Sequence, residues 1–172
     1  MMEITVETAE PLVGGRLAAL YERHSQEAVR LAYLLTGNRA QAEDLVQDAF
    51  VRLAGRFIDL RDPDGFVHYL RRTVVNLSNS LWRRRKVERA YLEREMQRPV
   101  AEAAESPDPA EREALWQSLR RLNPKQRTAI VLRFYEDLSE EQTADAMGVP
   151  KGTVKSLVSR GLEAMRQEIR GE

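Results

Sequence analysis

The stretch that most constrains the fold of this chain is residues 138–166, LSEEQTADAMGVPKGTVKSLVSRGLEAMR, which predicts two helices joined by a tight turn. Ser139 and Gln142 have the spacing of a capping box, in which the two residues satisfy each other's free backbone N–H groups. Gly148 suits the left-handed conformation that ends a helix, and Thr153 is the predicted cap of the second helix. This layout is typical of helix-turn-helix proteins, whose second helix enters the DNA major groove.

The second helix of this motif is predicted to be amphipathic. Val154, Leu157 and Val158 would turn inward. The outward face would carry side chains that can reach phosphates and base edges, namely Lys155, Ser156, Ser159 and Arg160. An ordinary helical hairpin without DNA-binding activity has the same spacing and stays open as the alternative.

The composition excludes several classes of protein. None of the 172 residues is a cysteine, so the chain has neither a disulfide framework nor a thiolate metal site. His24 and His68 are too isolated for a typical zinc site, and no phosphate loop or nucleophile–histidine pair is legible, so we expect no cofactor and no enzyme. The acidic N-terminus lacks the apolar core of a signal peptide, and no apolar run approaches the roughly 20 residues of a membrane span. We therefore expect a cytoplasmic protein without membrane insertion.

Charge is unevenly distributed, although the formal net charge is zero. Residues 82–89 read WRRRKVER, which is either a solvated helix end or a phosphate-binding patch. The acidic, proline-containing segment 97–108 interrupts the helical period and predicts a flexible linker. It separates an N-terminal module, residues 12–96, from a C-terminal module, residues 109–172. Because no strand-like alternation of useful length occurs, we expect an all-α fold of two small helical domains.

The N-terminal module is predicted to hold three helices, over residues 15–36, 38–56 and 62–86, with Asn38 capping the second and Asp62–Pro63 starting the third. The second helix has an apolar face, and the opposite face carries Glu43, Asp44, Gln47 and Asp48. Those carboxylates are either solvated groups that favour the helix N-terminus or a docking face for a basic partner.

The third helix is predicted to have a separate polar stripe. Steps of three, four and seven residues align Tyr69, Arg72, Asn76, Ser80 and Arg83. An aromatic ring can stack on an unpaired base, and an amide can bond to a base edge. The stripe continues into the arginines that follow Trp82, and it therefore predicts a nucleic-acid face.

Three segments, with the linker between the second and the third, resemble one family: AEDLVQDAFVRL, YLRRTVVNLSNSLWRRR and LRRLNPKQRTAIVLRFYEDLSEEQTADAMGVPKGTVKSLVSRG. They resemble a bacterial extracytoplasmic-function (ECF) sigma factor of the sigma-70 family, and RDPDGFVHYLRRTVVN is most similar to the SigE-like subgroup. The resemblance implies an initiation subunit of RNA polymerase. Residues 12–96 would form a region 2-like domain for the minus-ten promoter element, and residues 109–172 a region 4-like domain for the minus-thirty-five element. A stand-alone helix-turn-helix transcriptional regulator is the alternative; it would usually dimerise, and no heptad seam is evident.

The resemblance also implies a role for individual residues. The surface that docks on the beta-prime coiled coil of the polymerase core corresponds to Asp44, Gln47 and Asp48. Minus-ten recognition and melting correspond to Leu60, Asp62, Tyr69, Arg72, Asn76, Arg83, Arg84 and Arg85. The minus-thirty-five recognition helix corresponds to Thr153, Lys155, Ser156, Ser159 and Arg160. The implied partners are the polymerase core, including its beta flap, and promoter DNA, with an anti-sigma factor left open.

The chain departs from the family pattern at a few positions. The loop before the third helix carries Asp62 and Asp64, and its apolar member is Leu60 or Ile58 where many relatives have an aromatic residue. Leu157 and Ser159 also differ from several relatives. These departures bear on which promoter sequence is read, and they leave the class of protein unchanged.

Overall fold

A computed structural model describes residues 10–54, 63–92 and 116–169, and all the regular structure in these ranges is helical, as the sequence predicts. The helices, in chain order, are α1 (Glu10–Thr36), α2 (Arg39–Ala54), α3 (Pro63–Leu92), α5 (Pro124–Ile130), the π-helix η2 (Val131–Tyr135), α6 (Glu140–Met147) and α7 (Lys151–Ile169). Residues 116–121 are helical as well. Leu60, Asp62 and the predicted linker 97–108 lie outside the described residues.

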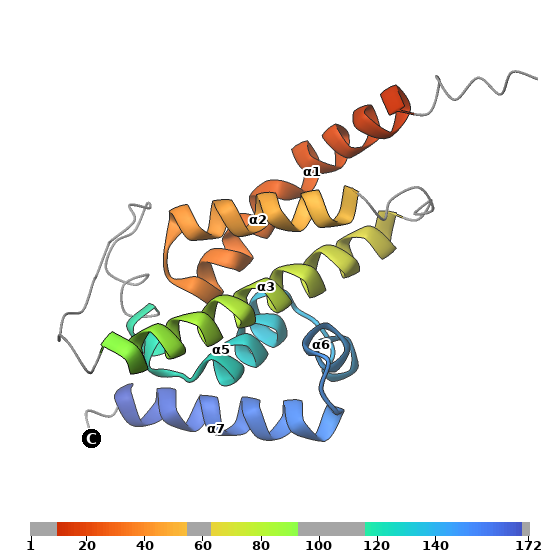
Figure 1. The fold of residues 1–172 in the computed structure, drawn as a ribbon. Coiled ribbons are helices and arrows are strands. Elements are labelled where there is room, and N and C mark those ends of the chain that lie inside the picture. Colours follow the sequence, from red (N-terminus) through yellow and green to blue (C-terminus); the bar gives the residue numbers. More distant parts are fainter. Residues whose placement is uncertain (1–9, 55–62, 93–115, 170–172) are drawn as a thin grey trace, which may run out of the picture.

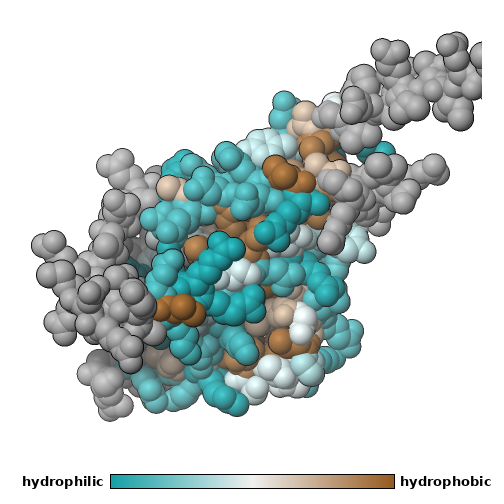
Figure 2. Space-filling view, viewed as in Figure 1, coloured by the Kyte–Doolittle hydropathy of each residue, from teal (hydrophilic) through white to brown (hydrophobic). Residues whose placement is uncertain are grey.

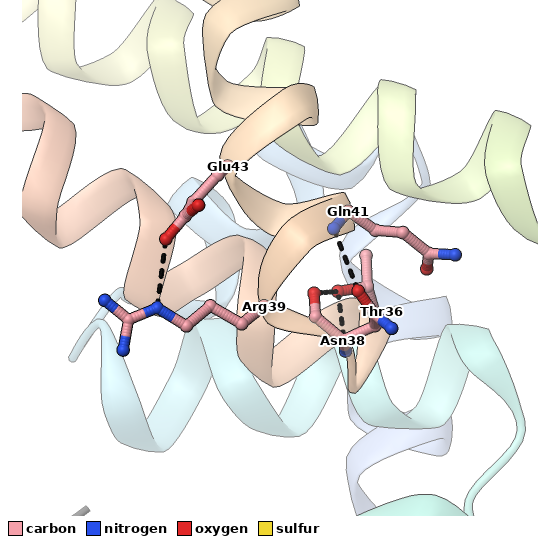
Figure 3. A network of polar contacts seen from close by, with 5 residues as sticks. All are labelled: Thr36, Asn38, Arg39, Gln41 and Glu43. Carbon is pink, nitrogen blue, oxygen red and sulfur yellow. Dashed lines mark hydrogen bonds and ion pairs between the residues drawn. The ribbon is translucent and has the colours of Figure 1, made fainter. Parts of the chain in front are cut away.

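The junction of α1 and α2 follows the predicted capping chemistry. Gly37 ends α1 in the left-handed conformation, with φ +76°. The side chain of Asn38 then accepts a hydrogen bond of 2.9 Å from the backbone N–H of Gln41, which confirms Asn38 as the cap of α2 (Figure 3). The Thr36 hydroxyl donates to the Ala32 carbonyl at 2.8 Å, within the last turn of α1.

Helix α3 begins at Pro63, as predicted, but runs to Leu92, beyond the predicted end near residue 86. No glycine or proline occurs between Gly65 and Pro99, and the residues after Lys86 are mostly good helix formers, so nothing local stops the helix there. Figure 1 shows α3 lying between the α1–α2 pair and the C-terminal helices α5, α6 and α7. This helix therefore contacts both halves of the molecule.

The apolar faces of the helices meet in one continuous core. The contribution of α1, α2 and α3 consists of Ala28, Leu31, Ala32, Leu35, Ala42, Leu45, Val46, Ala49, Phe50, Leu53, Phe66, Leu70, Val74 and Val75. The same core continues into Leu119, Leu122, Ile130, Val131, Leu132, Leu138 and Ala146. The sequence leaves the arrangement of the two modules open, and the structure packs their helices against each other.

The C-terminal helices are set by local signals, with one difference from prediction. Ser139 and Gln142 form the predicted capping box, and Gly148 ends α6 with φ +65°. However, α7 begins at Lys151, and the backbone N–H of Thr153 donates to the Pro150 carbonyl at 2.9 Å. Thr153 was therefore wrongly predicted as the cap; it lies inside the first turn. The fixed φ of proline allows the helix to start directly after Pro150.

The π-helix η2 is a feature that sequence periodicity does not reveal. Its closing hydrogen bond runs from the Glu136 N–H to the Val131 carbonyl, at 3.1 Å. Arg133 donates to the Leu138 carbonyl and ties η2 to the start of α6. Phe134 and Tyr135 are 60% and 50% exposed. Short π-helical turns are frequent at functional sites, and this one carries two exposed aromatic rings.

One face of the molecule is mainly polar. The side of the molecule in Figure 2 is largely hydrophilic, with small separate apolar patches. No helix in the described ranges is long and apolar enough to cross a membrane. Within the same ranges, His, Asp and Glu side chains form no group of three or more that could hold a metal ion.

Candidate nucleic-acid and protein interfaces

Helix α7 presents the predicted outward face. Val154 and Leu157 are buried, whereas Lys155, Ser159 and Arg160 are exposed. The Ser156 hydroxyl, by contrast, is half-buried and donates to the Thr153 carbonyl at 2.9 Å. Three of the five predicted residues thus have freely accessible side chains.

The position of α7 depends on a glycine that the sequence reasoning missed. Gly161 is buried where α7 crosses α5, and a Cβ at this position would lie 2.6 Å from Cδ1 of Ile130. The absence of a side chain lets the two helices approach closely, which fixes how α7 projects from the C-terminal helices. A glycine inside a predicted helix was the available signal.

Helix α3 presents the predicted polar stripe over its length. Tyr69, Arg72, Asn76 and Arg83 are exposed, while Leu70 and Val74 are buried on the other side. Ser80 is half-buried and accepts a hydrogen bond of 3.0 Å from Arg83.

The arginines at the end of the stripe differ from one another. Arg83 and Arg84 are exposed. Arg85 is half-buried, donates to the Gln41 side chain, and has its guanidinium 5.5 Å from the centre of the Trp82 ring. The structure therefore places Arg83 and Arg84 in solvent and directs Arg85 toward α2.

Helix α2 presents a compact acidic face. Asp44, Gln47 and Asp48 are exposed, and the opposite side of the helix is buried in the core. Among the described residues, neither aspartate forms an ion pair or a hydrogen bond, in contrast to Glu43, which pairs with Arg39 at 2.9 Å (Figure 3). One turn further on, Val51 is 72% exposed and extends the same face with an apolar side chain.

A cluster of polar contacts joins α3 to the C-terminal helices. Nε2 of His68 lies 2.7 Å from an Asp145 carboxylate oxygen, and Nη1 of Arg72 lies 3.6 Å from the other oxygen. Nearby, Nε of Arg71 lies 2.5 Å from Glu136. These pairs leave no signal in the sequence, because the partners are far apart in the chain. They bring Arg72, a predicted DNA contact, against a carboxylate of α6.

A buried arginine joins α1, α3 and α5. Arg127 donates to the carbonyls of Leu119 at 2.8 Å and Leu35 at 3.2 Å. Its guanidinium lies 5.1 Å from the centre of the Trp82 ring, and the Trp82 indole N–H donates to the same Leu35 carbonyl at 3.1 Å. Burial, with a smaller contribution from Arg120, lowers the pKa of Arg127 to about 10, so the side chain is still a cation at neutral pH. Sequence reasoning gave no signal for this residue.

A groove of about 320 Å³ lies between η2 and α7. Phe134, Val158 and Leu162 give it apolar walls, and Arg133, Lys155 and Arg166 supply positive charge around them. Glu140 also lines the groove, and its carboxylate lies 3.6 Å from Nζ of Lys155. The exposed ring of Phe134 is thus part of a concave surface with a basic rim.

The chain matches two family models in the order that these surfaces predict. Residues 20–88 match sigma-70 region 2, and residues 112–165 match sigma-70 region 4. The first match contains the α2 and α3 surfaces, and the second contains η2, α6 and α7. The fold, with the exposed faces of α2, α3 and α7, therefore defines a transcription protein of the sigma-70 type.

Individual relatives narrow this class. The chain is 39% identical over 150 residues to the RNA polymerase sigma-E factor of Streptomyces coelicolor, covering 87% of this chain and 84% of the relative. Its fold is similar to that of the sigma factor RpoE of Bartonella quintana in complex with the anti-sigma factor NepR, with TM-score 0.66, 23% identity and coverage of 96% and 98%. It is also similar to CnrH in complex with the cytosolic domain of CnrY, with TM-score 0.63, 22% identity and coverage of 91% and 88%.

The chain belongs to the ECF sigma factors of the sigma-70 family. It is a noncatalytic specificity subunit of RNA polymerase that directs transcription initiation, and this function entails binding to the polymerase core. The family membership replaces the alternative of a stand-alone regulator.

Proposed function

We propose that this sigma factor divides its work among three surfaces: α2 docks on the polymerase, α3 captures the minus-ten strand, and α7 reads the minus-thirty-five duplex. The observation that carries this proposal is the separation of exposed charge. The α2 face is acidic and unpaired within the described residues, whereas the α3 and α7 faces carry arginine, lysine, amide and aromatic groups. The proposal follows the predicted modules, residues 12–96 and 109–172.

Polymerase docking is assigned to Asp44, Gln47 and Asp48, and its partner is the beta-prime coiled coil. Complementary charge accelerates association and fixes the register of two surfaces. Asp48→Lys is expected to weaken binding to core polymerase roughly tenfold or more. Glu22→Lys on α1 is the matched control, because it makes the same charge change at another exposed site. Equal core affinity of the two folded variants would contradict the assignment.

Minus-ten capture is assigned to Tyr69 and Asn76, with Arg72, Arg83 and Arg84 toward the backbone. Melting needs no catalytic group; it needs sites that bind an unstacked base better than a paired one. Asn76→Ala should slow open-complex formation on duplex promoters. It should also reduce transcription from a pre-melted template, because base capture is still needed there. Permanganate footprints and transcription provide the measurement. Wild-type behaviour on both templates would exclude this role for Asn76.

Minus-thirty-five recognition is assigned to the α7 residues, and Lys155 and Arg160 are expected to differ in kind. If Arg160 binds a guanine with both of its terminal nitrogens, Arg160→Ala should cost about 1–3 kcal/mol and relax the preference at one base pair. Lys155→Ala should weaken binding about equally across sequences, since a phosphate contact carries no sequence information. A selection of minus-thirty-five variants with both holoenzymes measures the difference. Unchanged preference of Arg160→Ala at every position would remove this assignment.

The beta flap is the second polymerase contact, and its proposed seat is the groove beside Phe134. The apolar walls, with Arg133 and Arg166 at the rim, fit a helix with an apolar face and acidic ends; Lys155, on the same rim, is left to the DNA. Because Phe134 is 60% exposed, Phe134→Ala should leave the fold intact and weaken binding of a beta-flap fragment by several-fold. Val87→Ala, at an exposed apolar site on α3, is the control. Equal flap affinity in both variants would exclude the groove.

An anti-sigma factor is proposed as a regulatory partner, because two similar solved structures are complexes in which a sigma-type chain is bound by another protein. Because RNA polymerase acts in the cytoplasm, we expect this sigma factor to act there as well. Affinity capture from the source bacterium with tagged full-length protein tests both statements. Recovery of core polymerase supports the sigma assignment, and a stoichiometric second protein that displaces the core supports an anti-sigma factor.

A further inference from the structure

Lys151, the first residue of α7, extends the outward face of this helix by one turn. Steps of four residues align Lys151, Lys155 and Ser159 in one row, and Ser156 and Arg160 in a second row. The side chains of the two lysines are 47% and 61% exposed. Lys151 therefore lies at the start of the recognition helix, which is the part that approaches the DNA in helix-turn-helix proteins.

The two rows differ in their partners. Nζ of Lys151 lies 2.8 Å from a carboxylate oxygen of Glu141, and Nζ of Lys155 lies 3.6 Å from one of Glu140. These glutamates are the first two residues of α6, and Figure 1 shows α6 beside the start of α7. Arg160 has no carboxylate partner among the described residues. The lysine row is thus opposed by negative charge, and the arginine row is not.

Helix stability does not explain a lysine at the start of α7. A cation is unfavourable at the N-terminal end of the helix dipole, and the first turn of α7 has no acidic residue to offset it. Glu141 offsets it from α6: the hydrogen bond between them raises the pKa of Lys151 and lowers the pKa of Glu141, so both are charged at neutral pH. The Glu141 side chain is 78% exposed, and such a pair contributes little to folding. Another anion can therefore replace this carboxylate.

We propose that Lys151 is a further contact of α7 with the DNA backbone, and that Glu141 and Glu140 weaken the backbone contacts of Lys151 and Lys155. The inference rests on the function proposed for α7. A phosphate must take each lysine from its carboxylate, and this cost is the same for every DNA sequence. The base contact assigned to Arg160 bears no such cost. The carboxylates thus reduce the part of the affinity that carries no sequence information.

The salt dependence of binding distinguishes this role from a structural one. A lysine that binds a phosphate releases about one counterion from the DNA. When Lys151 leaves Glu141, the freed carboxylate attracts a cation from solution and cancels much of this release. Removal of the carboxylate should therefore make the salt dependence steeper, whereas a change in helix packing would leave its slope unchanged.

The first measurement is the affinity of the full-length chain for a fluorescein-labelled duplex of mixed sequence, by anisotropy over a range of salt concentrations. Glu141→Gln should bind about two- to fivefold more tightly at low salt, and its plot of log affinity against log salt should be steeper by about one unit. The matched control is Glu163→Gln, which removes an exposed carboxylate of α7 that pairs with Arg166 at 3.8 Å, about three turns from Lys151. Equal affinities and slopes of the two variants would overturn the proposal. Absence of binding by both at the lowest salt would overturn it as well.

The second measurement is a double-mutant cycle on the same duplex. Lys151→Ala should weaken binding, and Lys125→Ala, at an exposed site on α5, should change it less. In the Lys151→Ala background, Glu141→Gln should lose most of its effect, because there is no lysine to release. The same gain in affinity in both backgrounds would show that Glu141 acts without Lys151, and it would overturn the pairing.

The proposed function of α7 is tested separately by Arg160→Ala. If this variant keeps the parent sequence preference, α7 does not read the minus-thirty-five element, whatever Glu141→Gln does on mixed-sequence DNA. If Arg160→Ala relaxes the preference while Glu141→Gln and Glu163→Gln bind equally, only the role of the carboxylates is lost.

Discussion

The two ends of α3 contact the C-terminal helices through different chemistry. Toward its C-terminal end, Trp82 packs on Arg127, and both donate to the Leu35 carbonyl. Toward its N-terminal end, His68 and Arg72 meet an Asp145 side chain that is 53% exposed. A buried donor without its acceptor is costly, whereas an exposed ion pair can be exchanged for solvent or another anion. Burial therefore decides which of the two polar contacts is a fixed part of the packing and which can exchange its partner.

The buried contact near the C-terminal end of α3 also shows how a cation is stabilised without a carboxylate. Arg127 is 3% exposed, and its guanidinium contacts backbone carbonyls and the face of an indole ring. Carbonyl dipoles and the ring quadrupole replace part of the lost hydration, and the pKa stays near 10. Such a site depends on several backbone carbonyls at once, so one of its hydrogen bonds cannot be exchanged without disturbing the others.

Among the substitutions that test this comparison, loss of Arg127 should lower the free energy of unfolding the most. Arg127→Ala leaves several buried carbonyls without a donor and should lower the free energy of unfolding by roughly 2–4 kcal/mol. Urea denaturation measures the change. Arg120→Ala, an exposed neighbour, is the control and should stay within about 0.5 kcal/mol of the parent. Equal destabilisation by the two substitutions would contradict the role of burial.

Trp82→Phe should have the next largest effect. It removes the indole N–H that donates to Leu35 and weakens the cation–π contact with Arg127, but it keeps an aromatic ring in place. We expect a loss of about 1–2 kcal/mol in the free energy of unfolding. The substitution in the Arg127→Ala background should have a smaller effect, because the partner is already gone. Additive effects would show that the two residues do not act together.

The Arg71–Glu136 pair lies between the two extremes. A double-mutant cycle with Arg71→Gln and Glu136→Gln should give a coupling energy of about 1 kcal/mol, since the pair is partly shielded from water. Raising the salt concentration should reduce this coupling less than that of an exposed pair. A coupling energy that vanishes at moderate salt would show that this pair behaves like a solvent-exposed ion pair.

The smallest effect is expected for Arg39 and Glu43 (Figure 3). The pair is exposed and confined to α2, and its arginine precedes the glutamate, which is the less favourable order at the start of a helix. A double-mutant cycle should give a coupling of no more than about 0.3 kcal/mol. A value near that of Arg71 and Glu136 would show that exposure does not rank these contacts.

Local signals in the sequence were sufficient for much of the fold and for the class of protein. Asn38, Ser139 and Gly148 occupy the cap positions that their chemistry predicts. Capping and helical periodicity depend on residues within about four positions of one another, so they can be predicted from a single chain. Thr153 shows the limit of such signals, because α7 begins directly after Pro150 and Thr153 therefore lies inside its first turn.

Long-range contacts were decided only by the tertiary structure. The Arg127–Leu35 hydrogen bond spans 92 positions, and the Arg71–Glu136 bond spans 65. Arginine and aspartate are most often solvated, so composition gives no sign that one arginine is buried in the core or that Asp145 faces the polar stripe of α3. The sequence by itself determined the helices, their polar faces and the family. Packing determined which polar side chains are buried or paired, because burial and pairing depend on segments that meet only after the chain has folded.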